Sequence, residues 1–132
     1  MIKALNTVEV ISLFVEDLGA ARAFYQNVFG LKVIYEDEVS AVVKLENLMI
    51  NLLQRSEAGT LVEPTPVAGR DAGARLLLTI AVADTNTVAA ELEKHGVKLL
   101  NGPVDRPWGR RTAAFADPDG NVWEIAQDLP KT

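Results

Sequence analysis

An approximate internal repeat is the feature that most restricts how this chain of 132 residues can fold. The segment from Val15 to Val33 aligns, with one gap, on the segment from Val82 to Leu99. Each copy reads as a strand, an aspartate that can cap a helix, an amphipathic helix, a glycine and a further strand. Such a repeat indicates two copies of one supersecondary unit, so it predicts the architecture before any single element.

The two predicted helices begin and end at equivalent residues. Asp17 and Asp84 stand where a side-chain oxygen can accept hydrogen bonds from first-turn N–H groups, and Gly30 and Gly96 stand where the helices should stop. Apolar residues recur at helical spacing in both segments. In the first segment they are Ala21, Phe24, Tyr25 and Val28. Both helices are therefore expected to lie against sheets.

A β-hairpin is expected to complete each copy. The first runs from Ala41 to Gln54 around a turn at Glu46-Asn47. The second runs from Thr112 to Gln127 around Asp117-Pro118-Asp119-Gly120, whose proline and glycine favour a tight turn. The fold class is therefore α+β, with two tandem βαβββ modules.

The chain is expected to form one domain over residues 1–132. Module 1 covers about 5–55, a linker about 56–74, and module 2 about 75–128. The linker has little apolar periodicity and holds Gly59, Pro64, Pro66, Gly69 and Gly73. Neither module alone is large enough to bury much core, so we expect them to form one cooperative unit or to pair with those of a second chain. A homodimer is the expected assembly.

Composition excludes several classes of function. The 18 acidic residues outnumber the 13 basic ones, for a net charge of −5, which argues against a nucleic-acid partner. The absence of cysteine excludes disulfides, thiolate metal sites and cysteine nucleophiles, and a single histidine excludes paired-histidine metal motifs. No apolar run approaches the length of a membrane span. A cytoplasmic bacterial enzyme or binding protein, with no membrane partner, is expected.

Several short blocks, spread over residues 5–128, resemble the vicinal-oxygen-chelate superfamily of glyoxalases, bleomycin-resistance proteins, fosfomycin-resistance enzymes and extradiol dioxygenases. The blocks are Asp17-Leu18, Ala23-Phe24-Tyr25, Phe29-Gly30-Leu31, Gly102-Pro103, Phe115 to Asn121 and Trp123-Glu124-Ile125. The resemblance implies that the two modules form a curved mixed sheet around a concave pocket. It is more specific for the fold than for a reaction.

In metal-dependent members of that superfamily, one ligand comes from the first and one from the last strand of each module. Carried over to this chain, those positions are Val10, Asn51, Leu77 and Glu124. Only Glu124 would bind a cation strongly, and a register shifted by one residue would still leave an aliphatic residue, Leu76 or Leu78, at the third position. His95 is expected to be a surface residue at a helix end. We therefore expect a pocket without metal or other cofactor.

Side chains alternate along a strand, so Glu124 should face the pocket while Trp123 and Ile125 face the core. The loop Asp105–Arg111 is expected to precede the last hairpin and to close the pocket mouth. There Arg110 or Arg111 would hold an anionic ligand and Trp108 would stack on a planar one. The predicted ligand-binding residues are Ser12, Phe14, Asn51, Leu53, Thr79, Trp108, Arg110, Arg111 and Glu124.

A purely structural interpretation stays open for the same side chains. The arginines would then pair with Asp105, Asp117 or Asp119, and Trp108 would fill a gap under the loop. Glu124 would lie on a solvated sheet face, neutralised by Arg110 or Arg111.

Three hypotheses of function follow. The first is a glyoxalase- or bleomycin-resistance-like protein that binds a small aromatic or amphipathic molecule, with two sites per dimer. The second is a lyase, isomerase or dioxygenase, with or without a divalent metal, in which Glu124 moves a proton and Arg110 or Asn51 stabilises an oxyanion. The third is a non-catalytic accessory subunit.

Overall fold

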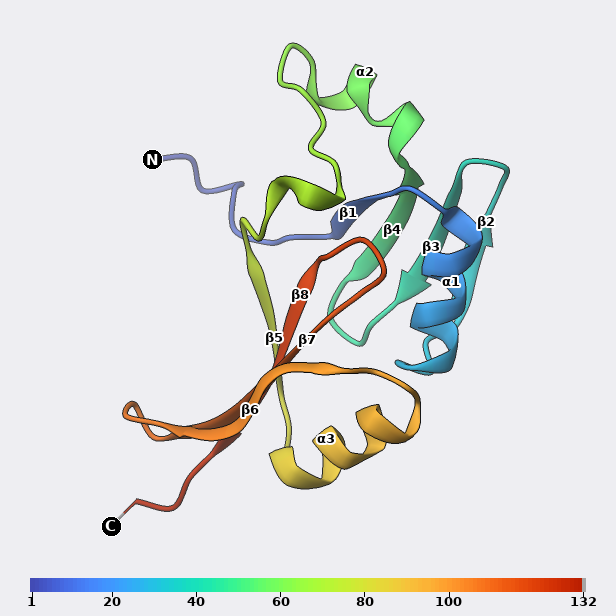
Figure 1. Cartoon of the computed structure of the whole chain (residues 1–132). Helices are drawn as coiled ribbons and strands as arrows, with labels where there is room; N and C mark the ends of the chain where they lie inside the picture. The colour runs from blue at the N-terminus through green and yellow to red at the C-terminus, as the bar shows by residue number, and fades with distance from the viewer. Residues whose placement is uncertain (132) are drawn as a thin grey trace. The chain divides into compact units, whose positions relative to one another are not determined.

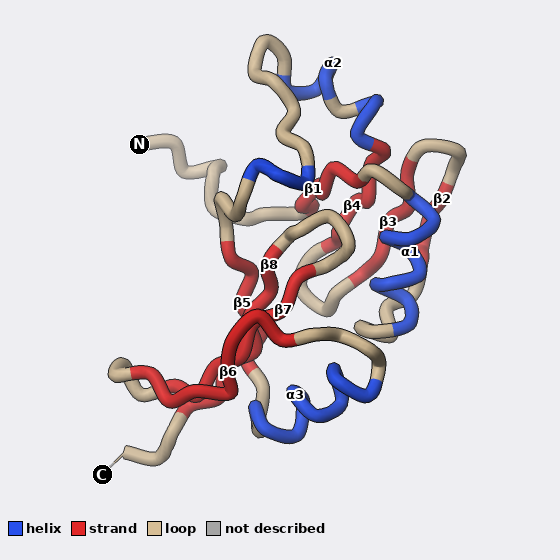
Figure 2. Tube along the Cα trace, viewed as in Figure 1, coloured by secondary structure: helices blue, strands red, loops and turns tan. Residues whose placement is uncertain are grey.

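The computed structural model describes residues 1–131 and divides the chain into two compact units, the first covering Met1–Gly69 and the second starting at Arg70 (Figure 1). The boundary between the units falls within the segment 56–74. Each unit contains one helix of ten residues and one four-stranded mixed sheet (Figure 2).

The first unit begins with β1 (Val10–Val15) and α1 (Leu18–Asn27). A meander of β2 (Val33–Glu36), β3 (Ser40–Lys44) and β4 (Met49–Gln54) follows. The strand order is β1-β4-β3-β2, with β1 parallel to β4 and the other pairs antiparallel. Short helical turns, η1 (Arg55–Glu57) and α2 (Gly59–Val62), come after the sheet.

The second unit repeats this topology. After the turn η2 (Arg70–Ala72) come β5 (Leu77–Ala81), α3 (Thr85–Lys94), β6 (Leu99–Arg106), β7 (Arg110–Ala116) and β8 (Val122–Asp128). The strand order is β5-β8-β7-β6, with β5 parallel to β8. The prediction of an α+β fold with two βαβββ modules is therefore confirmed.

Both helices begin at the predicted aspartates. A carboxylate oxygen of Asp17 accepts a hydrogen bond from the Ala20 N–H at 3.1 Å, and Asp84 accepts one from the Thr87 N–H at 3.1 Å. Each cap satisfies a first-turn N–H group that has no partner inside the helix. Just beyond the helix ends, Gly30 and Gly96 take positive φ values of 69° and 79°.

The core of the first unit lies between α1 and the sheet. Tyr25 is fully buried, and its ring contacts those of Phe24 and Phe29 with centroids 5.2 and 5.0 Å apart. The facing residues of the two central strands are buried as well. They are Ala41 and Val43 on β3 and Ile50 and Leu52 on β4.

The core of the second unit lies between α3 and strands β6, β7 and β8. Trp123 is only 3% exposed, as predicted, and lies opposite Phe115 of β7. Ala89 and Leu92 are buried on the helix side. The alternate residues of β8, which include Glu124, consequently point to the other face of the sheet.

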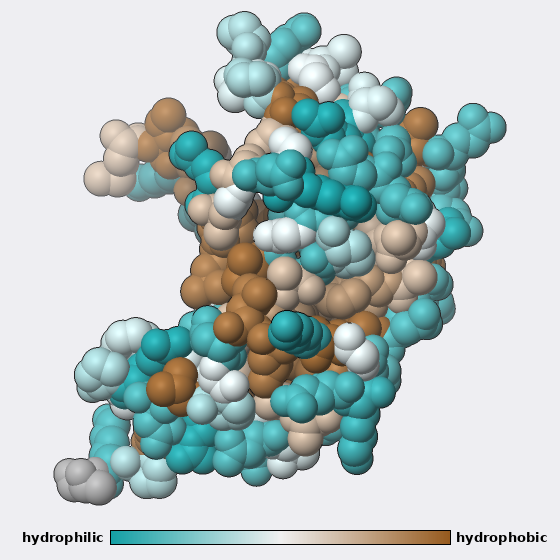
Figure 3. Space-filling view, viewed as in Figure 1, coloured by the Kyte–Doolittle hydropathy of each residue, from teal (hydrophilic) through white to brown (hydrophobic). Residues whose placement is uncertain are grey.

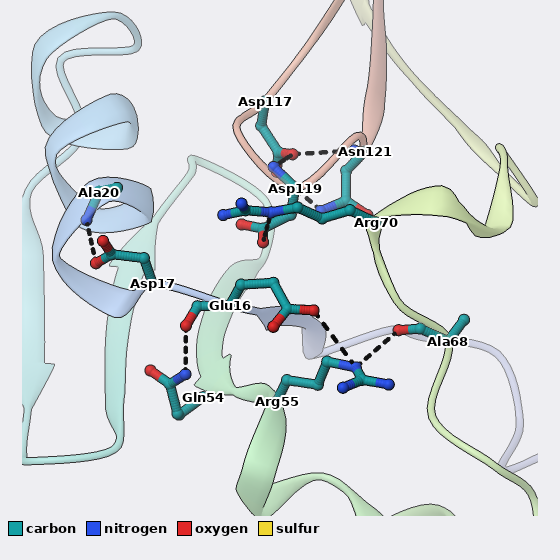
Figure 4. Close-up of polar contacts among 10 residues, drawn as sticks. All are labelled: Glu16, Asp17, Ala20, Gln54, Arg55, Ala68, Arg70, Asp117, Asp119 and Asn121. Carbon is teal, nitrogen blue, oxygen red and sulfur yellow. Dashed lines mark hydrogen bonds and ion pairs between the residues drawn. The ribbon is translucent and has the colours of Figure 1, made fainter.

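The segment after the first sheet is held to the first unit by one arginine. The guanidinium of Arg55 donates a hydrogen bond to the carbonyl oxygen of Ala68 at 3.2 Å (Figure 4) and one to that of Val67 at 3.0 Å. The Arg55 Nε also lies 3.6 Å from a carboxylate oxygen of Glu16. The segment that the sequence predicts as a linker contains short helical turns, and hydrogen bonds from Arg55 attach it to the first unit.

The expectation that residues 105–111 form a loop before the last hairpin is wrong. Asp105 and Arg106 end β6, Arg110 starts β7, and only residues 107–109 form the turn. Gly102-Pro103 hides this strand in the sequence, because such a pair usually ends a strand. In the structure the pairing with β7 is irregular between Asn101 and Val104 and then continues.

Large apolar side chains remain exposed at the start of the first strand of each unit. They are Val8 and Val10 in the first unit and Leu76 and Leu77 in the second. Figure 3 shows apolar surface among hydrophilic side chains on one face of the molecule. No helix within residues 1–131 is long and apolar enough to cross a membrane.

Candidate functional site

The second unit holds one carboxylate on the sheet face that α3 does not cover. Glu124 pairs with Thr79 in the parallel β5–β8 register, and the Thr79 hydroxyl donates a hydrogen bond to Glu124 Oε1 at 3.0 Å. On the other side Glu124 lies opposite Ala114 of β7. The carboxylate is thus half-buried, fixed by a hydroxyl and flanked by a small apolar residue.

The first unit carries an uncharged pair at the corresponding place. Ser12 and Asn51 are partners in the parallel β1–β4 register, and the Asn51 Nδ2 donates a hydrogen bond to the Ser12 hydroxyl at 3.3 Å. The Asn51 Oδ1 is buried without a hydrogen-bond partner in the part of the chain that the structure describes. Phe14 and Leu53 pair two residues further along and lie on the same face.

The structure thus divides the predicted ligand-binding residues between two sheets. Ser12, Phe14, Asn51 and Leu53 share one face of the first sheet, and Thr79, Glu124 and Arg110 share one face of the second.

Arg110 of β7 pairs with Asp128, which lies four residues along β8 from Glu124. This places Arg110 and Glu124 about 13 Å apart along the strand direction. The Arg110 Nε lies 3.1 Å from a carboxylate oxygen of Asp128, and its Nη2 donates a hydrogen bond to the Ala126 carbonyl at 3.3 Å. Arg110 therefore neutralises Asp128, and the alternative in which it neutralises Glu124 is wrong.

Arg111 points to the opposite face of the sheet from Glu124, since it alternates with Arg110 and Thr112. It donates two hydrogen bonds to Asp105, from Nε at 2.6 Å and from Nη2 at 3.3 Å. These hydrogen bonds and the opposite charge lower the pKa of Asp105 and raise that of Arg111. Arg111 thus makes the structural pair with Asp105 that the sequence left open.

Trp108 lies in the β6–β7 turn with 67% of its surface exposed. The alternative that it fills a gap under a loop is therefore wrong. The guanidinium carbon of Arg106 lies 5.9 Å from the centroid of the Trp108 ring, within the range of a cation–π contact.

Sequence reasoning missed Arg106 as a site residue. Its Nε donates a hydrogen bond to the Thr112 hydroxyl at 3.0 Å, and its Nη2 donates one to Asn101 Oδ1 at 3.1 Å. Arg106 pairs with Arg110 across the hairpin, so it lies on the face that carries Glu124. The hairpin register would have revealed this residue, but the segment was expected to be a loop.

The donor groups present do not fit a divalent metal of the kind the resemblance implies. Val10 and Leu77 have no donor atom, which leaves one amide and one carboxylate from the four carried-over positions. No group of three or more His, Asp or Glu residues within residues 1–131 could hold a metal ion. His95 caps the end of α3, as predicted for a surface residue, with its Nδ1 2.9 Å from the Glu91 carbonyl oxygen.

A shallow depression of about 490 Å³ lies between the end of α3 and β6. Its lining residues are Glu93, Gly96, Val97, Lys98, Leu99 and Gly102. None of the predicted site residues lines it, so it is separate from the face that carries Glu124.

Residues 6–125 match the family model of the Glyoxalase/Bleomycin resistance protein/Dioxygenase superfamily. Two bacterial relatives are similar over nearly the whole chain. The YraH protein of Bacillus subtilis is 32% identical over 90% of this chain and 96% of its own length. Virulence protein STM3117 of Salmonella typhimurium is 27% identical over 93% of this chain and 85% of its own length.

The fold is also that of solved structures. A glyoxalase/bleomycin resistance protein/dioxygenase from Nocardioides superposes with a TM-score of 0.85 at 21% identity, covering 96% of this chain and 86% of that chain. At this identity the likeness concerns the fold alone.

Proposed function

We propose, from the premise that this chain belongs to the Glyoxalase/Bleomycin resistance protein/Dioxygenase superfamily, that it binds a small molecule on the sheet face that carries Glu124. The observation that carries the proposal is the hydrogen bond from Thr79 to Glu124, which holds a half-buried carboxylate in one position. Small-molecule sites typically combine apolar walls with a few fixed polar groups. Val122, Ala114 and Ala126 supply apolar neighbours on the same face.

The chemistry of Glu124 suggests what the ligand carries. Its Oε1 accepts a hydrogen bond from the Thr79 hydroxyl, and Oε2 has no hydrogen-bond partner within residues 1–131. A carboxylate accepts hydrogen bonds only, so the ligand should present an N–H or O–H donor. A small aromatic or amphipathic molecule with an amine, amide or hydroxyl group meets this requirement.

We also propose that this site works without a metal or other cofactor, because two of the four carried-over positions have no donor atom. The lyase, isomerase and dioxygenase alternatives receive less support. Arg110, one of the two expected oxyanion partners beside Asn51, forms an ion pair with Asp128 instead of facing Glu124. Nothing specific in the structure favours an accessory subunit.

For the assembly we propose a homodimer in the bacterial cytoplasm. The apolar residues Val10 and Leu77, 38% and 50% exposed at the free sides of β1 and β5, support a partner surface. The two bacterial relatives support a bacterial origin of the chain.

Isothermal titration calorimetry tests the binding proposal. The wild type and Glu124→Gln are each titrated with benzylamine and with benzyl alcohol. We expect the variant to bind benzylamine about 10-fold or more weakly, since hydrogen bonds to charged groups are the stronger kind. Glu91→Gln, which removes a carboxylate from the exposed face of α3, should leave binding unchanged. Equal binding by wild type and Glu124→Gln would overturn the proposal.

Metal analysis of protein purified without chelators tests the metal-free part. The expected content of nickel, zinc, iron and manganese is far below one ion per chain. A stoichiometric content of any of them would contradict it.

A further inference from the structure

One arginine differs from the others in what holds its guanidinium. Five of the seven arginines form ion pairs with carboxylates. The pairs are Arg22–Glu36, Arg55–Glu16, Arg70–Asp119, Arg110–Asp128 and Arg111–Asp105. Arg75 is exposed. Arg106 is half-buried and fixed, yet its partners, the Thr112 hydroxyl and the Asn101 amide oxygen, are both neutral.

The hydrogen bonds of Arg106 leave one edge of the guanidinium available. Nε and Nη2 use the side edge, toward Thr112 and Asn101. No acceptor within residues 1–131 is bonded to Nη1. The two parallel N–H groups of Nη1 and Nη2 are the arrangement that binds a carboxylate through both of its oxygens.

The surrounding charges favour an anion at this edge. Arg106 lies directly opposite Arg110 in the β6–β7 pair, and like charges at such positions destabilise a sheet. Asp128 neutralises Arg110, so the charge of Arg106 is left without a carboxylate in the described part of the chain. A bound anion would offset it.

Trp108 adds an aromatic surface to this anion site. Its ring contacts the Arg106 guanidinium and remains 67% exposed. A ring joined to the bound carboxylate would cover part of this surface, with the gain that aromatic pairs provide.

We propose that Arg106 and Trp108 bind the aryl carboxylate end of the ligand whose donor end meets Glu124. This inference rests on the proposed function in placing both ends of one ligand on the same sheet face. Thr112, which holds Arg106, lies opposite Ala126, two residues from Glu124. Strand geometry puts the Cα atoms of Thr112 and Glu124, which are diagonal neighbours on adjacent strands, about 8 Å apart. A benzoate with a donor group opposite its carboxylate spans such a distance.

The test is an NMR titration that follows the Arg106 Nε–H and Trp108 indole N–H signals, with acetate, benzoate, benzylamine and 4-(aminomethyl)benzoate as probes. Benzoate should shift both signals and bind more tightly than acetate. Arg106→Gln should weaken benzoate binding about 10-fold or more. The control Arg75→Gln, which removes one positive charge from an exposed arginine of the second unit, should bind benzoate as the wild type does.

Trp108→Ala keeps the test valid if Arg106→Gln destabilises the hairpin, because an exposed turn residue can be shortened without opening the core. It should weaken benzoate binding about 3-fold and leave acetate binding unchanged. Wild-type benzoate affinity in a folded Arg106→Gln variant, or no response to benzoate at all, would overturn the inference.

The remaining probes separate this inference from the proposed function. Glu124→Gln should weaken the binding of 4-(aminomethyl)benzoate but leave the binding of benzoate unchanged. If the binding of benzylamine depends on Glu124 while benzoate does not bind, only the inference fails. If the binding of benzoate depends on Arg106 while Glu124→Gln changes the affinity for none of the probes, only the proposed role of Glu124 fails.

Discussion

The two modules place equivalent polar groups at equivalent points of their sheets but differ in charge. Ser12 and Thr79 each stand five residues before the aspartate that caps the following helix. In the first module the hydroxyl meets the Asn51 amide, and in the second it meets the Glu124 carboxylate. The two modules thus share the strand topology and the position of a polar pair, whereas the last-strand residue is an amide in one and a carboxylate in the other.

Features that serve the backbone are shared by the two modules. Gln54 and Gln127 each stand three residues after the polar residue of the last strand. The Gln54 Nε2 donates a hydrogen bond to the Glu16 carbonyl at 2.6 Å, and the Gln127 Oε1 accepts one from the Thr85 N–H at 3.0 Å (Figure 4 shows the first). Both side chains fasten the end of the last strand to the start of the helix.

Features that organise charge are concentrated in the second module. Its β6–β7 hairpin carries Arg106, Arg110 and Arg111, and its strands are longer than β2 and β3 of the first module. The comparison therefore predicts that substitutions in matched positions affect the two modules unequally.

The largest effect is expected for Gly102→Ala, because β6 approaches β7 more closely than an alanine allows. Gly102 has a φ of 83°, and an added Cβ would collide with the Thr112 carbonyl oxygen and lie 2.7 Å from the Ala113 Cα. Backbone strain and overpacking together should reduce the free energy of unfolding by about 3 kcal/mol or more. Urea denaturation followed by circular dichroism measures this loss.

Gly109→Ala is the matched control for Gly102→Ala. Gly109 has a similar φ of 87°, but nothing lies within 4 Å of an added Cβ. The Gly109→Ala variant should lose only about 1 to 2 kcal/mol of unfolding free energy, because alanine is unfavourable at this φ. Equal losses for the two variants would show that the close approach of β6 to β7 contributes nothing.

An intermediate effect is expected for Asp117→Ala in the turn between β7 and β8. The buried Asp117 carboxylate accepts hydrogen bonds from the N–H groups of Asp119 and Asn121 and from the Asn121 side chain, each at 2.9 Å (Figure 4). Leaving these donors without their acceptor should cost about 2 kcal/mol.

The corresponding turn of the first module has a similar backbone hydrogen bond, from the Leu45 N–H to the Leu48 carbonyl at 3.0 Å, but the exposed Asn47 side chain takes no part in it. Asn47→Ala should therefore change the unfolding free energy by less than about 0.5 kcal/mol. A loss in Asn47→Ala as large as that in Asp117→Ala would contradict the distinction between the two turns. Thermal denaturation of both variants gives the comparison.

The smallest effect concerns the charge of the second helix cap. The Thr87 N–H and hydroxyl, the Asn86 N–H and the Arg111 charge hold the pKa of Asp84 below its ordinary value of 3.8. Because the pKa is lower in the native than in the unfolded state, this contribution to stability is fully present above pH 3.8 and is lost as the pH falls through the native pKa.

Asp84→Asn isolates this charge, since asparagine is also a good capping residue. The difference in urea midpoint between wild type and Asp84→Asn should therefore be larger at pH 7 than at pH 3. A difference that grows on acidification would contradict the assignment.

The sequence predicted the backbone well because its signals are local. The aspartate caps, the glycines with positive φ and the alternation of apolar residues act within a few positions of one another, and both helices and both predicted hairpins follow from them. The exception is β6, where Gly102-Pro103 resembles the end of a strand. Its continuation depends on pairing with β7, which local signals do not encode.

The candidate site was predicted only in part because it depends on which residues become neighbours. Strand alternation correctly placed Trp123 in the core and Glu124 on the other face. It could not show that Thr79, rather than an arginine, would contact Glu124, since that contact joins strands 45 residues apart.

By itself, the sequence determined the duplicated order of strands and helices, their caps and the lack of donor side chains at two of the carried-over ligand positions, because each depends on residue type and short-range spacing. The tertiary structure alone decided which arginine each carboxylate neutralises, and so left Arg106 with neutral partners. Long side chains reach several neighbours across a sheet, and only the strand register selects among them.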